Sequence, residues 1–186
     1  MVLKKITTTI VVEFITPLGQ QILEPQTLLK PIGERYQVKI PTVIGYVLVG
    51  HQGDLSGVAD TKKIVRLIYK ELGELVIRKG LAGNYTLVEP FQNSSDALKI
   101  KKIKLPKLEE KEAYYFVEEK AGKQVLGARV ADTNNFIPSD PTKKVYLFCL
   151  TPAQYKKLNG DWGVPEIQLG EEVIIKPIFN EDSRSI

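Results

Sequence analysis

The chain has very few side chains of the kinds that hold soft metals or build catalytic dyads. Its 186 residues include one cysteine, Cys149, one histidine, His51, and one methionine. A lone cysteine cannot form a disulfide within the chain, and with one histidine it cannot supply the three or four ligands of a zinc site. His51 reads as part of a polar loop and Cys149 as part of a buried strand, which disfavours nucleophilic catalysis through either. We expect no metal and no cofactor.

Long apolar runs are also missing. No segment approaches the roughly 18 residues that cross a bilayer. The basic residues 1–9 lack the apolar core and cleavage site of an export signal. The sequence therefore predicts a soluble chain without membrane insertion, either cytosolic or excised from a longer exported protein.

Motifs of nucleotide, calcium and glycosidase chemistry are not found. There is no phosphate-binding Gly-x-x-x-x-Gly-Lys-Ser/Thr loop. Asp132, Asp140 and Asp161 are isolated, unlike the acids of a calcium loop. Adjacent acids on a strand point to opposite faces, so they do not face each other across a cleft as glycoside hydrolysis requires. The adjacent pairs, which we expect to be solvated, are Glu109-Glu110, Glu118-Glu119 and Glu171-Glu172. No catalytic residue is predicted.

Positive charge is in small excess, with 26 Lys and Arg against 22 Asp and Glu. The surplus lies in residues 1–70 and is too dilute for the basic face of a nucleic-acid-binding protein. The densest basic stretch is 99–107. Glu109, Glu110 and Glu112 follow it at once, so the sequence predicts mutual neutralisation and no nucleic-acid partner.

Many segments of the chain have the residue pattern of β-strands. β-Branched residues fill 7–15, a Pro17-Leu18-Gly19 turn follows, and an extended run resumes at Gln21, which predicts a hairpin. Prolines and glycines punctuate the later runs at the spacing of small β-rich domains. The further predicted strands are 36–40, 46–49, 64–69, 75–77, 85–88, 114–117, 125–130, 145–150 and 173–178.

Two segments have helical signals. Residues 25–32 are too short and too flanked by proline for more than a turn of helix. Residues 151–160 begin with Thr151 as N-cap and Pro152 at the first helical position, and they end in Asn159-Gly160, which predicts a short helix. Glycine and charge density rise near 71–82, which predicts one domain over 1–72 and a second over 73–186.

A set of spaced residues over 11–70 resembles the MucBP (mucin-binding protein) repeat. The order of features is a strand, a turn at a glycine, a Gly-x-x-Tyr segment, an Ile-x-Gly-Tyr-like core and a closing strand ending in Tyr-Lys. Phe14 stands where the family commonly has tyrosine, and Lys30 where it often has glycine. The residues that carry the resemblance are Phe14, Gly19, Gly33, Tyr36, Gly45, Tyr46 and Tyr69.

The resemblance implies a ubiquitin-like β-grasp fold for the first domain. It also implies a place in a cell-wall-anchored surface protein of Gram-positive bacteria, where such modules adhere to mucin glycans. We expect the glycines to form tight turns and the tyrosines to bury their rings with the hydroxyl near water, as folding residues and not ligand contacts. Residues 73–186 carry no family signature and are predicted to be a second, mostly β domain with one short helix.

The one tryptophan, Trp162, lies in a Gly/Pro loop. A ring in such a loop often stacks on a sugar or grips a partner, which makes Trp162 the candidate for ligand binding. The alternative is that it plugs the core of the second domain.

The sequence as a whole predicts a β-rich α+β protein that acts as a non-catalytic adhesion module at a cell surface. It would bind mucin or another host glycoconjugate, with strength added by neighbouring modules of a longer parent chain. Two alternatives stay open. A structural spacer predicts no glycan affinity, and a carbohydrate-active enzyme in 83–186 predicts a pocket with two converging carboxylates.

Overall fold

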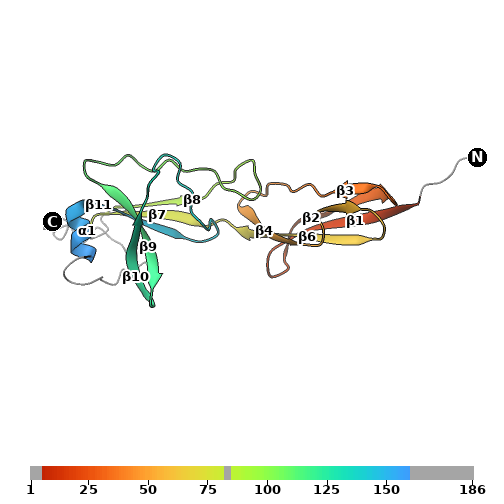
Figure 1. Ribbon diagram of the computed structural model, residues 1–186, viewed down its shortest axis with the longest axis horizontal. Coiled ribbons are helices and arrows are strands. Elements are labelled where there is room, and N and C mark those ends of the chain that lie inside the picture. The colour runs from red at the N-terminus through yellow and green to blue at the C-terminus, as the bar shows by residue number, and fades with distance from the viewer. Residues whose placement is uncertain (1–5, 82–84, 160–186) are drawn as a thin grey trace, which may run out of the picture. The chain divides into compact units, whose positions relative to one another are not determined.

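The computed structural model describes residues 6–81 and 85–159, which fold into two compact units (Figure 1). Unit 1 comprises residues 6–72 and 92–100, and unit 2 comprises the described residues of 73–91 and 101–159. For these residues the predicted β-rich class with one short helix is confirmed. Unit 1 contains β1 (Thr7–Ile15), β2 (Gln21–Pro31), β3 (Arg35–Gln37), β4 (Tyr46–Gln52), β5 (Ser56–Val58) and β6 (Lys63–Glu71). Unit 2 contains β7 (Glu74–Lys79), β8 (Tyr85–Pro90), β9 (Ala113–Lys120), β10 (Lys123–Arg129), β11 (Val145–Leu150) and α1 (Pro152–Asn159).

Unit 1 is built on a four-stranded sheet in the order β2-β1-β6-β4. Its first and last strands, β1 and β6, are parallel neighbours at the centre, and both outer pairs are antiparallel. Side chains alternate between the two faces along a strand, so every second residue of β1 is buried on one face. The β3-β5 ribbon and adjoining loop residues complete that core. Its members are Ile10, Val12, Phe14, Tyr36, Val38, Val43, Leu48, Ala59, Val65, Leu67 and Tyr69.

The predicted β1-β2 hairpin is confirmed. The backbone N–H of Gly19 donates to the carbonyl of Thr16 at 2.9 Å and closes the turn. The helical turn predicted within 25–32 is wrong, because these residues continue β2 as far as Pro31. Pro25 lies at a register shift of the ladder, where its missing N–H interrupts no regular pair.

A later stretch of chain, residues 92–100, belongs to unit 1 although the sequence placed it inside the second domain. The side chain of Asn93 accepts a hydrogen bond from the backbone N–H of Gly45 at 2.7 Å. Its amide nitrogen donates to the carbonyls of Val43 at 3.0 Å and Tyr46 at 2.7 Å. The carbonyl of Ala97 accepts from the N–H of Leu48 on β4 at 2.9 Å. The stretch thus satisfies backbone groups along β4 and the turn before it.

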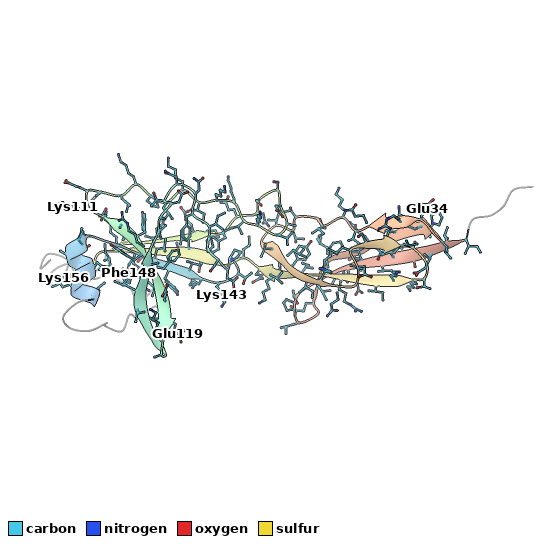
Figure 2. All side chains as sticks on the ribbon, viewed as in Figure 1. Glu34, Lys111, Glu119, Lys143, Phe148 and Lys156 are labelled. Atoms are coloured by element: carbon cyan, nitrogen blue, oxygen red, sulfur yellow. The ribbon has the colours of Figure 1, made fainter. Side chains whose placement is uncertain are left out.

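Unit 2 is a five-stranded sheet in the order β10-β9-β11-β7-β8, with β11 and β7 parallel. Strand β11 is central and nearly all buried, which suits its unbroken apolar sequence. On one face Phe148, labelled in Figure 2, and Leu150 pack with side chains of β9, β10 and α1. On the other face the ring of Phe116 lies 5.8 Å from that of Phe136.

Helix α1 is confirmed together with its predicted cap. The hydroxyl of Thr151 accepts from the N–H of Gln154 at 3.3 Å, and the Gln154 side chain accepts from the N–H of Thr151 at 2.9 Å. This reciprocal pair is a capping box. The ring of Tyr155 lies 4.5 Å from that of Tyr115 and fixes the helix on the sheet. The predicted strand 173–178 lies outside the described residues.

Candidate binding surfaces

The aromatic residues of the MucBP-like pattern lie in the core of unit 1. Phe14 and Tyr69 have no exposed surface, and their ring centroids are 6.5 Å apart. The hydroxyls of Tyr69 and Tyr36 donate to the carbonyls of Pro41 at 2.8 Å and Asp54 at 3.0 Å, so they tie loops to the sheet. Burial raises the pKa of Tyr69 to about 12. Tyr46 is half-buried. A ligand reaches the first two rings only by opening the core.

The glycines of the pattern shape turns. Gly19, Gly33 and Gly45 have φ angles of +86°, +97° and +85°. Residues with a Cβ are strained in this region, and no heavy atom would otherwise crowd a Cβ at these places. Their role is therefore conformational.

The second face of the sheet in unit 1 is partly exposed. Glu13 on β1 pairs with Arg66 on β6, and the Nε of Arg66 donates to Oε1 of Glu13 at 2.8 Å. About a third of the Glu13 side chain and somewhat more of Arg66 are exposed. Val11 and Ile64 form the adjacent pair and are also partly exposed. This face of the sheet therefore presents a charged pair of side chains next to an apolar pair on its partly exposed surface.

Unit 2 contains a cavity of about 210 Å³. The side chain of Glu112 is 7% exposed, and its carboxylate lies 3.5 Å from the ammonium of Lys79. The same ammonium lies 3.4 Å from the carboxylate of Glu109. Burial alone would lower the pKa of Lys79, but Glu112 and Glu109 outweigh it, so the pKa is raised and the lysine is charged. The lining residues are Ile77, Lys79, Pro106, Lys107, Glu112, Tyr114 and Cys149.

Cys149 lines this cavity as a neutral thiol. Burial, followed by the nearby Glu112 carboxylate, raises its pKa to about 12. A thiol of this kind is a poor nucleophile, because the thiolate is the reactive form. His51 lies in unit 1, where its Nδ1 is 2.9 Å from the carbonyl of Gly53.

We expect Cys149 to resist alkylation in the folded protein. Incubation with iodoacetamide at pH 8 should leave the thiol unmodified while the chain is native, and modification should become rapid in guanidinium chloride. Intact-mass spectrometry measures both. Fast modification of the native chain at pH 8 would contradict a buried, neutral thiol.

The acids that follow the predicted basic stretch pair with a lysine outside that stretch. The sequence predicted that Glu109 and Glu112 neutralise the lysines of 99–107, but both carboxylates pair with Lys79 on β7. This part of the prediction is wrong. Pairing across 30 residues of sequence depends on the β7-β11-β9 arrangement and carries no local signal.

Groups of three or more His, Cys, Asp or Glu that could hold a metal do not occur among the described residues. Within those residues no helix is long and apolar enough to cross a membrane. The binding candidate Trp162, with Asp161 and the Glu171-Glu172 pair, lies outside them. The carboxylates of Glu118 and Glu119 belong to the exposed end of β9, where Glu119 is labelled in Figure 2.

Comparison with known proteins gives a match for one part of the chain. No curated protein matches the chain. The family model of the MucBP domain matches residues 9–70, which confirms the resemblance drawn over 11–70. The matched segment runs from β1 to β6 and covers the strands of unit 1 except for the first two residues of β1 and the last of β6. MucBP is a family of binding domains and suggests a mucin-binding module of a surface protein. Residues 9–70 of this chain thus match the MucBP domain family.

Proposed function

We propose that unit 1 is a non-catalytic adhesion module of a bacterial cell-surface protein and binds mucin or another host glycoconjugate. The observation that carries the proposal is the match of residues 9–70 to the MucBP domain. The strand order supports a β-grasp assignment for the unit, since its first and last strands pair in parallel at the centre of the sheet. A β-grasp fold usually has a helix packed on its sheet. The residues described for unit 1 include no helix, so unit 1 would be a β-grasp sheet without that helix.

The proposed contact surface is the partly exposed sheet face around Glu13 and Arg66. The MucBP-like rings of Phe14 and Tyr69 point into the core and are not available. The Arg66 side chain is 43% exposed while Glu13 orients it, and a planar fork of N–H donors suits carboxylate and hydroxyl groups of a glycan. Val11 and Ile64 beside it provide apolar surface for a sugar ring.

The test is a titration of the full chain against purified mucin and a glycan array at ~0.15 and ~0.3 M NaCl. We expect saturable binding that survives the higher salt, and a loss of about fivefold or more in affinity for Arg66→Ala. Arg35→Ala, on the exposed position of β3, is the matched control and should bind as the parent does.

A folded chain that binds neither mucin nor any glycan would overturn the proposal and favour a spacer. Binding that Arg66→Ala and Arg35→Ala weaken equally would overturn the choice of face.

A further inference from the structure

Residues 103–106 of unit 2 are held against the rest of the unit by hydrogen bonds of their backbone. Ile103 exchanges two backbone hydrogen bonds with Phe136, at 2.9 and 2.7 Å. The N–H of Leu105 donates to the carbonyl of Thr133 at 2.8 Å, and the hydroxyl of Tyr114 donates to the carbonyl of Pro106 at 2.7 Å. Leu105 is buried, at 3% exposure, and anchors the segment on the body of unit 2.

Alternation along this segment turns lysines outward. Because Ile103 and Leu105 face the protein, Lys102 and Lys104 face solvent on the opposite side, about 7 Å apart along the chain. Lys101 and Lys107 are exposed as well. We call these four residues, Lys101, Lys102, Lys104 and Lys107, the lysine ridge.

The ridge has no ion-pair partner within the described part of the chain. Residues 97–108 contain no acid, and Glu109 and Glu112 bind Lys79 instead. Asp132 lies near enough for Lys102 to help lower its pKa, but stronger causes are its hydrogen bonds from Asn134 and Asn135. Among residues 6–81 and 85–159, at least three of the four positive charges are therefore left without a matching acid.

We propose that the lysine ridge binds an acidic polysaccharide, a glycan chain that carries sulfate or carboxylate groups. Short lysine-rich stretches form such polyanion sites through their combined field. Because the backbone is already fixed, little conformational entropy is lost when a chain docks along it. The proposal goes beyond the proposed function, since the ridge lies outside the MucBP domain and in the other unit.

The surroundings of the ridge favour a polysaccharide over a single-stranded nucleic acid. Its cations are all lysines, which act as point charges and attract any polyanion, so the discrimination comes from the aromatic rings beside them. Single-stranded nucleic acids also need aromatic rings on which bases stack. The rings next to the ridge, Phe136 and Tyr114, are each 3% exposed and unavailable for stacking.

The experiment measures heparin binding by the full chain, with neutral dextran as the uncharged comparison, over a series of NaCl concentrations. The test variant changes Lys101, Lys102, Lys104 and Lys107 to Gln. The matched control makes the same change in net charge at four other exposed lysines, Lys39, Lys62, Lys70 and Lys156. We expect the test variant to lose about tenfold or more in affinity and to show a salt dependence shallower by about three to four units of log–log slope, by counterion release. The control should change affinity by less than about threefold.

Equal losses in the two variants would show attraction by net charge alone and overturn the ridge as a site. Parent binding to dextran as tight as to heparin would overturn recognition of acidic groups. Tighter binding of single-stranded DNA than of heparin, lost in the test variant, would overturn the polysaccharide assignment. Heparin binding that Arg66→Ala weakens as much as the test variant does would place the acidic polysaccharide on the sheet face of unit 1 and overturn the ridge. Mucin binding lost only in Arg66→Ala, with heparin binding lost mainly in the test variant, tells the two sites apart.

Discussion

Phe14→Ala should destabilise unit 1 by about 3–5 kcal/mol, the usual cost of truncating a buried phenylalanine. Phe14 has no exposed surface and packs between its β1 neighbours and the ring of Tyr69. Removing the ring leaves a cavity at the centre of the sheet, where the hydrogen-bonded β1 and β6 backbones limit collapse. Hydrogen exchange resolved by element measures the effect as lost protection in β1 and β6.

Leu147→Ala is the matched variant in unit 2, because Leu147 on β11 is also fully buried. It should reduce protection in β7, β9 and β11. If Phe14→Ala lowers protection equally in both units, the assignment of Phe14 to a core belonging to unit 1 is wrong.

Asn93→Ala should cost about 2–3 kcal/mol of unit 1 stability, although residue 93 lies beyond the MucBP domain. The substitution removes the acceptor of the Gly45 N–H and the donor to the carbonyls of Val43 and Tyr46. The turn before β4 then loses three hydrogen bonds at once. We expect faster hydrogen exchange at Gly45 and Leu48 than in the parent.

Two further variants test whether the hydrogen bonds of the Asn93 side chain, and not any change in this stretch, stabilise unit 1. Asn93→Asp keeps an acceptor for Gly45 but places carboxylate oxygen against two carbonyls, so we expect it to destabilise at least as much as Asn93→Ala. Ser95→Ala, in the same stretch, removes an exposed side chain and should leave exchange unchanged. A neutral Asn93→Ala would mean that residues 92–100 do not stabilise unit 1.

Much of the fold could be predicted because its signals are local. Alternation over 7–15 and the Pro17-Leu18-Gly19 turn are enough to define the β1-β2 hairpin. The Thr151 and Pro152 pair likewise defines the start of α1. Strand β5 was not predicted, since Ser56–Val58 has no apolar run and is ordered by pairing with β3.

The candidate surfaces depend on pairing between distant residues, which is why they escaped prediction. Composition suggested that the 99–107 lysines meet the acids that follow them. The structure gives those acids to Lys79 because β9 and β7 flank β11, and this arrangement exists only once the sheet has formed. The contact of Asn93 with Gly45 joins residues 48 positions apart and leaves no trace in the local pattern.

The return of residues 92–100 to unit 1 also affects how the chain can fold while it is being synthesised. Unit 1 reaches Leu72, but its remaining segment ends at Ile100, 100 − 72 = 28 residues later. At about 5–20 residues per second, translation of that interval takes on the order of 1–6 s. During that time the turn before β4 lacks its Asn93 partner, and β4 presents an unfinished edge of the kind to which other strands add. Unit 1 is therefore completed on the ribosome only after the residues of the β7-β8 hairpin of unit 2 have been synthesised.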